Sequence, residues 1–492
     1  MNATRPAAVV ILAAGEGTRM KSDLPKVLHP IGGLTLVGHA IRAARATGAR
    51  YVEVVVRHQR DRVVEHCRGL DPDLLFADQD DLMGTGRAVE CGLDALPDDV
   101  EGTVLVTSGD VPLLDGRTLL ELTERHTASG SAVTLVTARV PRPAGYGRVV
   151  RGADGTVEAV VEEKDATDEQ RAIDEINAGI YAFEASLLRR ALERIGTDNA
   201  QGEKYLTDVV GVARGDGHVV QAHVVEDLWQ TEGVNDRVQL ATLGRVLNER
   251  TCERHMRAGV TIVDPATTWI DVDVTIGRDT TILPGTQLLG ATSVGSACSI
   301  GPEVTLRDTE VRDGAKVTRA EVHLAVIGEA ATVGPYSYLR PGTVLGARGK
   351  IGGFVETKNA DIGEGAKVPH LTYCGDATIG EGANIGAGTI FANYDGVAKH
   401  HTTVGRHSFI GSDTVIVAPV AVGDGAYVAA GSALTKDVEP GQIAVARGTQ
   451  RNIDGWVARA RAGTATHAAA EAASASARPT HTEPEREGDD AS

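Results

Sequence analysis

A short apolar run near the start of the chain breaks into glycines and then into two cations. Residues 10–30 read VILAAGEGTRMKSDLPKVLHP, with Gly15, Gly17, Arg19 and Lys26 in close succession. Backbone N–H groups in a run of small residues can turn toward an oxyanion, and the two cations add point charges. The pattern predicts a site for a phosphate-rich ligand, although a tight turn with solvated cations explains the glycines alone equally well.

Two common phosphate-binding loops do not fit this segment. The third glycine of a dinucleotide fingerprint would fall at position 20, which is Met20, and the chain has no GxxxxGK[ST] sequence. The ligand must therefore be identified from residues further along the chain.

A second group of polar residues lies far downstream. Residues 367–388 read KVPHLTYCGDATIGEGANIGAG and place His370 three positions before Tyr373. Imidazole titrates in the range that a general base needs near neutral pH. A surface turn residue is the ordinary explanation of a single histidine, so His370 by itself does not define a site.

The totals restrict the class of protein that carries these residues. A chain of 492 residues exceeds the size at which one core stops growing, so two or more domains are expected. A net charge of −18 and 3% aromatic residues disfavour a nucleic-acid binder. Five cysteines without CxxC spacing suit reduced thiols in a cytoplasm. No window approaches the ~20 apolar residues of a membrane span, so none is expected.

The first half of the chain alternates apolar runs with amphipathic stretches. Strands are predicted at residues 7–15, 51–56, 102–110 and 131–140, and helices at 36–48 and 115–130. Strands rich in Val, Leu and Ile that alternate with helices indicate a largely parallel sheet covered on both faces. Ligands bind such sheets at the carboxyl ends of the strands.

From about Val260 the apolar period changes to six. The spacing is kept by three runs of aliphatic residues, namely Val404, Ile410, Ile416, Val422 and Val428; Ile327, Val333 and Leu339; and Ile379 and Ile385. A helix cannot hold a period of six on one face, whereas each strand of a three-sided coil contributes one inward aliphatic residue. The pattern predicts a left-handed parallel β-helix.

These sequence patterns divide the chain into four parts. We expect a Rossmann-like α/β domain at residues 1–236 and a linker helix at 237–259, within a helical pattern that runs from about Asn235 to His255. The β-helix should occupy residues 260–460. Residues 461–492 are poor in aliphatics and rich in Ala, Ser and acids, which predicts a disordered tail.

One interruption of the hexads stands out. The repeat halts after Ile390 for FANYDGVAKHHTT and resumes at Val404. Insertions in repeat proteins commonly form binding surfaces, because they add nothing to the solenoid core. The AKHH end of the insertion is interpreted as a solvated loop end.

Taken together, the motifs resemble one enzyme family. LAAGxGTRM followed by SDLPK is similar to the signature of sugar-1-phosphate nucleotidyltransferases. Its combination with hexapeptide repeats resembles the bacterial bifunctional N-acetylglucosamine-1-phosphate uridyltransferases that are also glucosamine-1-phosphate acetyltransferases. The resemblance covers nearly the whole chain apart from the tail, and HLTY, NIGAG and NYDG extend it into the repeats.

The resemblance implies a set of residues for uridylyl transfer. Arg19 and Lys26 match cations that contact the triphosphate and act in catalysis, and Asp110 and Asn235 match Mg²⁺ ligands. Alone, Asp110 and Asn235 could equally be helix N-caps. Many members have Tyr where this chain has Ser108. The positions matching UTP and UDP-sugar contacts are Leu12, Ala14, Gly15, Lys26, Gln79, Gly84, Thr85, Gly147, Glu162, Asn177 and Asn235.

A second set is implied for acetyl transfer. His370 matches the base that takes the proton of the attacking amine. Arg340, Lys358, Tyr373 and Asn384 match groups that bind glucosamine 1-phosphate. The positions matching acetyl-CoA contacts are Ala387, Asn393, Tyr394, Ser412, Ala430 and Arg447.

The family activity then becomes the expectation for this chain. Acetyl-CoA acetylates glucosamine 1-phosphate, and UTP converts the resulting N-acetylglucosamine 1-phosphate to the UDP-sugar used in cell-wall synthesis, with release of pyrophosphate. The resemblance also implies a cytoplasmic homotrimer that uses Mg²⁺. An alternative is a single-activity sugar nucleotidyltransferase whose β-helix is structural or regulatory, and a third is a non-enzymatic scaffold. The group of His370, Tyr373, Asn384 and the inserted loop argues against the single-activity enzyme. The presence of Lys26, Asp110 and Asn235 argues against the non-enzymatic scaffold.

Overall fold

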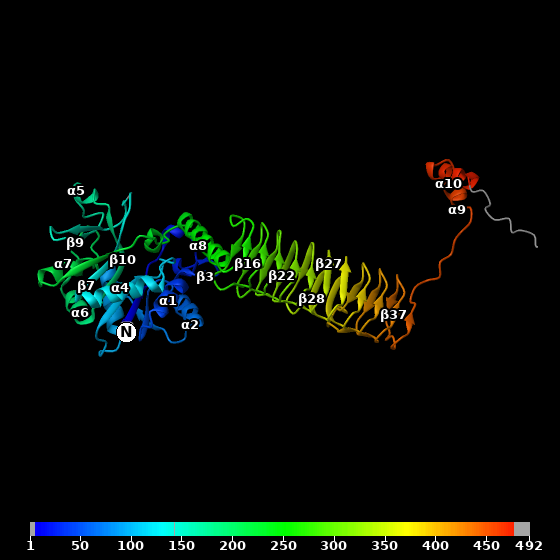
Figure 1. Ribbon diagram of the computed structural model, residues 1–492, viewed down its shortest axis with the longest axis horizontal. Coiled ribbons are helices and arrows are strands. Elements are labelled where there is room, and N and C mark those ends of the chain that lie inside the picture. The colour runs from blue at the N-terminus through cyan, green and yellow to red at the C-terminus, as the bar shows by residue number, and fades with distance from the viewer. Residues whose placement is uncertain (1–4, 142, 477–492) are drawn as a thin grey trace, which may run out of the picture.

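Residues 5–141 and 143–476 are described by the computed structural model (Figure 1). An α/β unit occupies the first part of the chain, the long helix α8 (Arg237–Arg257) follows it, and a rod of short strands extends from α8. The elements appear in the order in which the sequence predicts them.

The α/β unit is built on a nine-stranded sheet. Its main path runs β11-β7-β10-β6-β1-β4-β5, and β1 pairs in parallel with both β4 and β6. Strand β10 lies antiparallel between β6 and β7. The strands are β1 (Ala8–Leu12), β4 (Tyr51–Val56), β5 (Leu75–Asp78), β6 (Thr103–Ser108), β7 (Val133–Arg139), β8 (Arg148–Arg151), β9 (Val157–Val161), β10 (Glu175–Glu184) and β11 (Val220–Val224).

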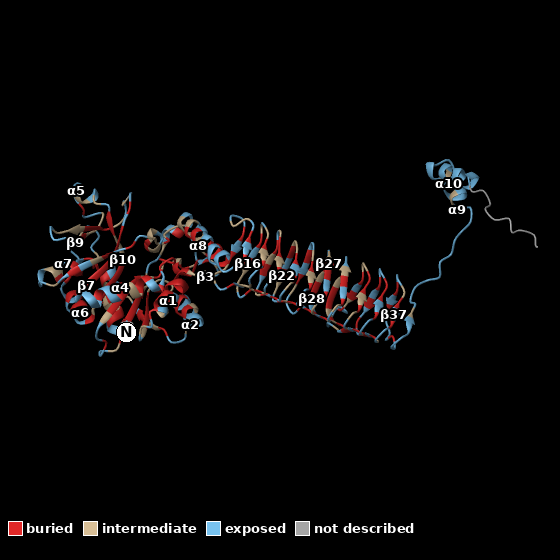
Figure 2. Cartoon of the chain, in the orientation of Figure 1, coloured by how far each residue is buried: buried red, intermediate tan, exposed pale blue. Residues whose placement is uncertain are grey.

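Helices cover both faces of this sheet, as the apolar strands require. Helices α3, α6 and α7 pack on one face, and α1, α2 and α4 pack on the other. Figure 2 shows the buried sheet between exposed outer helix faces. The helices are α1 (Leu36–Ala46), α2 (Arg60–Leu70), α3 (Thr85–Ala95), α4 (Gly116–Ser129), α5 (Asp168–Arg171), α6 (Ala185–Arg194) and α7 (Asp208–Gly215).

The C-terminal rod is a parallel β-helix. Its strands run from β12 (Thr261–Ile262) to β39 (Ile443–Ala444) and form an 11-stranded and a 17-stranded sheet. In the 11-stranded sheet each strand pairs with the strand about one coil further along the chain, as β12 does with β15 (Thr281–Ile282) and β15 with β18 (Ser299–Ile300). The chain therefore winds so that each coil stacks on the previous one.

The hexad residues form the core of this rod. Val404, Ile410 and Ile416 are fully buried, and the other residues of the six-residue pattern are at most 2% exposed. Each is the inward side chain of a short strand, which confirms the prediction from the period. The core is thus a column of aliphatic side chains.

Helix α8 joins the two units. Its first half contributes Leu243 and Val246 to an apolar cluster that also contains Met20. Its second half contributes Cys252 to the core of the β-helix, and the Asn248 side chain bonds the backbone of Thr268 and Ile270 at 2.7 and 2.9 Å. The linker helix therefore belongs to both cores.

The end of the described chain differs from expectation. The β-helix was predicted to reach residue 460, but its last strand ends at Ala444 and helix α9 (Trp456–Ala460) follows. Helix α10 (Ala465–Ser476) lies where a disordered tail was predicted. Alanine has the highest helix propensity, which accounts for α10 despite its lack of buried residues. Residues 477–492 of the predicted tail lie outside the described residues. No helix within the described ranges has the length and apolarity that crossing a bilayer requires.

Candidate active sites

The glycine-rich loop after β1 brings Lys26 against its own backbone. Gly17 has φ of +68°, and a Cβ at this position would lie 2.5 Å from Cβ of Lys26. Only glycine tolerates both that conformation and that approach. Arg19 lies in the short helix η1 (Thr18–Met20), and Lys26 begins η2 (Lys26–Leu28). The loop therefore places both cations at the carboxyl end of β1.

Asp110 lies at the neighbouring strand end. Strands β1 and β6 pair with Leu12 opposite Ser108, so the loops that follow them lie side by side. Ser108 Oγ donates to Asp110 Oδ1 at 2.7 Å, and the other oxygen of Asp110 forms an ion pair with Lys26. The Ser108 side chain thus contacts the Asp110 carboxylate directly.

Asn235 reaches the same place from the start of α8. The Val234 N–H donates to the carbonyl oxygen of Asp110 at 2.9 Å, which holds the two segments together. The Arg19 guanidinium donates to Oδ1 of Asn235 at 2.9 Å. Two cations and two side chains with oxygen donors, spread over more than 200 positions of the chain, therefore form one polar cluster.

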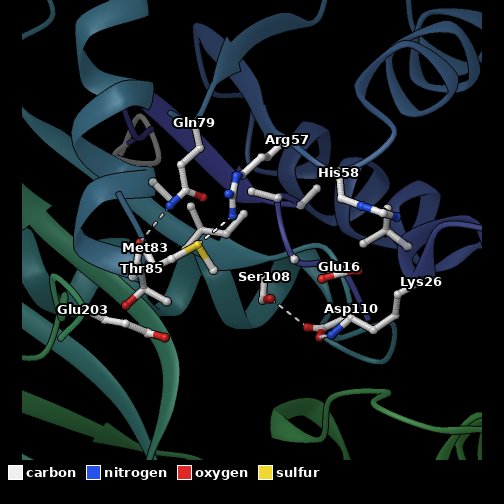
Figure 3. Close-up of a pocket in the computed structure, with 17 residues that line it drawn as sticks. Glu16, Lys26, Arg57, His58, Gln79, Met83, Thr85, Ser108, Asp110 and Glu203 are labelled. Atoms are coloured by element: carbon white, nitrogen blue, oxygen red, sulfur yellow. Dashed lines mark hydrogen bonds and ion pairs between the residues drawn. The ribbon is translucent and has the colours of Figure 1, made fainter. Parts of the chain in front are cut away.

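This polar cluster lies between two adjoining clefts of about 520 and 550 Å³. Figure 3 shows the first cleft, with Lys26 beside Asp110 on one side and Gln79 on the other. The first cleft is lined by Leu12, Ala14, Gly15, Lys26, Gln79, Gly84, Thr85 and Asp110 among others. The second is lined by Leu12, Arg19, Thr85, Asp110, Gly147, Glu162, Asn177 and Asn235 among others. Every residue predicted for the N-terminal site lines one or both.

Gln79 is held at the far side of the first cleft. Its Nε2 donates to the carbonyl oxygens of Leu82 and Gly84 at 3.0 and 3.2 Å. Both donors of the amide nitrogen are thereby engaged, which leaves Oε1 as an acceptor for a ligand. An acceptor at this place suits a base that presents a ring N–H, as uracil does.

The second cleft contains a half-buried carboxylate, that of Glu162. Burial is the main cause that raises the pKa of Glu162, and the nearby carboxylates of Asp208 and Asp165 act in the same direction. Its two oxygens lie 3.5 and 3.6 Å from where a Cβ on Gly147 would be. The absence of a side chain at Gly147 leaves the carboxylate open to this side, where it can accept hydroxyl groups.

Asn177 faces the same cleft because β10 is irregular there. The register of β10 against β7 shifts between Asn177 and Tyr181. Nδ2 of Asn177 donates to the Tyr181 hydroxyl at 2.6 Å, and Oδ1 accepts from the Gly179 N–H at 3.1 Å. A bulge re-aims a side chain out of the ladder, and here it directs an amide to the cleft wall.

The oxygen ligands of the polar cluster fit Mg²⁺. Mg²⁺ keeps several waters and needs only one or two protein oxygens. Asp110 and Asn235 supply a carboxylate and an amide oxygen on adjoining segments. Within residues 5–141 and 143–476, no three His, Cys, Asp or Glu side chains are grouped as a metal site. The donor set therefore suits a sparsely held hard cation.

Five of the predicted acetyl-transfer residues form a row along one corner of the β-helix, namely His370, Ala387, Ser412, Ala430 and Arg447. His370 ends β29 (Lys367–His370), and its carbonyl accepts from the Gly388 N–H. The carbonyls of Ala387 and Ser412 accept in the same way from the coil that follows each, and the Arg447 side chain donates to the Ala430 carbonyl at 2.8 Å. At about 4.8 Å between neighbouring strands, the row from His370 to Ala430 spans roughly 14 Å.

A group of cations lies beside His370's coil. Lys358 is on β28 (Glu356–Ile362), and Arg340 pairs with Glu356 of the same strand at 3.0 Å. The pKa of Lys399 is lowered, first by its contact with the Lys358 ammonium group. Ammonium groups pressed together in this way favour a bound dianion, since it relieves their repulsion.

Tyr373 and Asn393 are fixed to each other. Nδ2 of Asn393 donates to the Tyr373 hydroxyl at 3.4 Å and to Oδ2 of Asp376 at 2.5 Å. A Cβ on Gly375 would lie 2.4 Å from that hydroxyl. Asn384 begins β31 (Asn384–Ile385), the next strand of His370's sheet, and is half-buried. Tyr373 and Asn393 therefore meet directly, and Asn384 lies one coil away.

The inserted stretch is a small hairpin. Tyr394 and Lys399 form an antiparallel bridge, and Asp395 accepts from the N–H groups of Val397 and Ala398 at 2.8 and 2.7 Å. The Tyr394 side chain is 59% exposed, and its hydroxyl donates within the hairpin at 2.6 Å. The hairpin brings Lys399 to the cations, whereas the Tyr394 side chain points into solvent.

Lys399 is a site candidate that the sequence interpretation missed. It lies in AKHH, which was interpreted as a solvated loop end. The predicted insertion could have identified Lys399, because the end of an inserted loop rejoins the coil. A cation at that end therefore lies against the coil. Ser108 and Thr207 were likewise not predicted as contacts of Asp110 and Glu162.

Comparisons with known proteins identify both units. Residues 9–206 match the MobA-like NTP transferase domain, and residues 401–436 match the hexapeptide repeat of succinyl-transferase. The second match agrees with the left-handed coil predicted from the hexads. Fold and sites thus define a class, a nucleotidyltransferase domain joined to an acyltransferase-type β-helix.

Full-length relatives specify the family. The chain is 59% identical over 465 residues to the bifunctional protein GlmU of Mycolicibacterium vanbaalenii, covering 94% of each chain. It is 58% identical over 470 residues to that of Streptomyces avermitilis, covering 95% of this chain and 98% of the relative. The relative in Clavibacter sepedonicus is 57% identical over 457 residues, covering 93% of each.

The chain belongs to the bifunctional GlmU family. It is therefore a two-activity transferase, a uridyltransferase and a glucosamine-1-phosphate acetyltransferase, as the sequence motifs predicted. Its substrates are small molecules.

Proposed function

We propose that each activity belongs to one of the two sites described above. The observation that carries the proposal is that two separate groups of cations lie on different folding units and share no residue. One group contacts the side-chain oxygens of Asp110 and Asn235, and the other lies on the β-helix coils that flank His370 in the chain. In this scheme residues 1–236 catalyse uridylyl transfer, 237–259 link, and 260–460 catalyse acetyl transfer. Acetylation precedes uridylyl transfer, since the second reaction uses the product of the first.

In the N-terminal site, the chain positions two anions for an in-line displacement. The first cleft takes UTP, with Gln79 at the base, and the second takes the sugar phosphate, with Glu162 and Asn177 at the hydroxyl and acetamido groups. Arg19 and Lys26 neutralise phosphate charge between the clefts. Mg²⁺, held by Asp110 and Asn235, would supply further neutralisation of the triphosphate. The sugar phosphate attacks the α-phosphorus of UTP, and pyrophosphate leaves.

In the C-terminal site, the cations hold the phosphate of glucosamine 1-phosphate beside His370. The amine attacks the thioester carbonyl of acetyl-CoA, His370 takes the proton of the amine, and the sulfur of coenzyme A leaves as the C–S bond breaks. The corner row from Ala387 to Arg447 provides an extended surface for the coenzyme. Arg340, Lys358 and Lys399 bind the substrate phosphate.

A homotrimer is proposed with this arrangement. Aromatic and aliphatic side chains on the outside of the coils support it, because Tyr336, Phe354 and Leu371 are 58 to 62% exposed at the same corner of successive coils. Large exposed apolar surfaces mark protein contacts. A cytoplasmic location is proposed from the free cysteines and from co-substrates that are made there.

Two single substitutions test the assignment of activities to sites. Asp110→Ala should lower Mg²⁺-dependent pyrophosphate release by a factor of about 100 or more, because it removes an anionic ligand and the partner of Lys26. Acetyl transfer should stay close to that of the parent. His370→Ala should do the reverse.

Both rates are measured for both variants, so each unaffected activity is the control for folding. Mass spectrometry of products formed from glucosamine 1-phosphate, acetyl-CoA, UTP and Mg²⁺ identifies the reaction sequence. Loss of both activities from either change, in a folded protein, would contradict two independent sites.

A further inference from the structure

Thr207 directs its hydroxyl away from the helix that it precedes. It is the residue before α7, where a threonine side chain usually accepts from the first turn. Its own φ and ψ are −60° and −25°, and its side chain makes no capping bond. Instead Oγ1 donates to Oε1 of Glu162 at 3.2 Å. The Thr207 hydroxyl thus donates to the Glu162 carboxylate in the cleft and does not cap α7.

This contact lies in the wall of the second cleft. Thr207 is only 4% exposed, and it lines the cleft together with Glu162 and Leu206. Water therefore has little access to the hydroxyl from outside. Its proton has one acceptor in the described structure, the carboxylate oxygen.

The segment before Thr207 is hydrogen-bonded to residues that line the first cleft or adjoin it. The Lys204 N–H donates to the Met83 carbonyl at 2.9 Å. The Lys204 carbonyl accepts from the Gly86 N–H at 2.8 Å. The Leu206 N–H donates to Oγ1 of Thr85 at 3.2 Å. The position of Thr207 is therefore set from the nucleotide side, and its effect is exerted on the sugar side.

Glu162 has mostly acidic neighbours. Burial and nearby carboxylates raise its pKa, and the Thr207 hydrogen bond lowers it. The titratable groups that face it are Asp165, Glu203, Asp208, Tyr181 and Tyr205. No cation contributes among these described neighbours. The hydroxyl is thus the local group that favours the ionised carboxylate.

We propose that Thr207 is a positioning residue for uridylyl transfer, which orients the Glu162 carboxylate as a hydrogen-bond acceptor for the sugar phosphate. The proposal rests on the function proposed above for the second cleft. Because the hydroxyl acts through Glu162, its removal should affect the sugar phosphate and leave the nucleotide alone. Its removal should also change the pH dependence of kcat/KM for the sugar phosphate, since both oxygens of the carboxyl group are good hydrogen-bond acceptors only when the group is ionised.

The test uses Thr207→Val in the full-length chain. Valine keeps the shape and removes the hydroxyl, and α7 loses no capping bond by the change. We expect the KM for N-acetylglucosamine 1-phosphate to rise about tenfold at pH 7, the lower end of what the loss of one hydrogen bond to a charged group costs. The KM for UTP and the acetyl-transfer rate should not change.

The pH profile gives the readout that a merely structural role would not move. Without the donor, the pKa of Glu162 rises further, so the acidic limb of kcat/KM for the sugar phosphate should move to higher pH. Thr207→Ser, which keeps the hydroxyl, should restore both the limb and the KM. An unshifted limb in the valine variant, or an equal rise of both KM values, would overturn the proposal.

Two further measurements keep the outcomes separate. UTP binding by calorimetry reports whether the nucleotide cleft is folded. If the valine variant loses it, Thr207→Ala repeats the test, and loss in both overturns the proposal because the residue then supports the fold. Glu162→Gln tests the proposed function itself. If Glu162→Gln has a normal KM for the sugar phosphate, the assignment of Glu162 fails. If Glu162→Gln raises this KM but Thr207→Val does not, only the inference about Thr207 is overturned.

Discussion

Glu53 is a carboxyl group without a partner in the middle of the N-terminal sheet. It lies on β4 between β1 and β5 and is 0% exposed. Neither oxygen has a hydrogen-bond partner among the described residues. Oε2 lies 3.1 Å from where a Cβ on Gly92 of α3 would be, so the group is packed under that helix. Burial raises the pKa of Glu53 to about 8.

The sign and size of the effect on stability follow from this value. The folded state keeps the proton up to about pH 8, whereas the unfolded chain releases it from about pH 4.5. The free energy of unfolding therefore falls as pH rises between these values, by about 1.4 kcal/mol for each pH unit. Over the whole window this is about 5 kcal/mol. Glu53→Met, which fills similar volume without a charge, should remove the penalty.

Hydrogen exchange of peptides from β4 measures the change locally. The ratio of exchange rates, parent over variant at the same pH, should rise about tenfold for each pH unit between pH 5 and 8. Peptides from the β-helix in the same samples are the control and should give a constant ratio. A ratio for β4 that does not change with pH would refute the reasoning, because the carboxyl would then be solvated or paired.

Three other outcomes are expected. Gly375→Ala should lower acetyl transfer at least tenfold and leave uridylyl transfer unchanged in paired assays, since the new methyl group would displace the Tyr373 hydroxyl; unchanged acetyl transfer would exclude a role for this hydroxyl. Ser108→Ala should weaken Mg²⁺ binding about fivefold by loss of one hydrogen bond to Asp110, measured by calorimetry, and an unchanged affinity would count against the assignment of Asp110. Deletion of residues 465–492 should leave both steady-state rates intact, and a fall in either would give the tail a function.

Much of the fold could be predicted because its patterns are local. The hexad period requires an inward aliphatic residue in each short strand, and Val404 and Ile410 are fully buried as expected. Continuous apolar runs likewise predicted β1 and β6. Strand β10 was not predicted, because its insertion between β6 and β7 depends on antiparallel pairings with segments far away in the chain. A non-local pairing leaves no period in the sequence.

The candidate sites were predictable to the extent that single motifs contain them. Asp110 and Asn235 were identified by resemblance, and the structure adds the backbone bond from Val234 that brings their segments together. Lys399 and Thr207 were missed for a physical reason. Each acts through a partner in another segment, Lys358 or Glu162, and only the folded chain brings these pairs into contact.

The corner row of the β-helix has a geometric consequence. Its carbonyls are stacked at the strand spacing, so the reach from His370 to Arg447 is fixed by the number of turns between them and can change only in steps of about 4.8 Å. In the acyl-donor site proposed above, the rod would therefore set the reach of the site in whole coils. Whole turns can be added or removed without a new kind of core, because each turn repeats the same aliphatic layer.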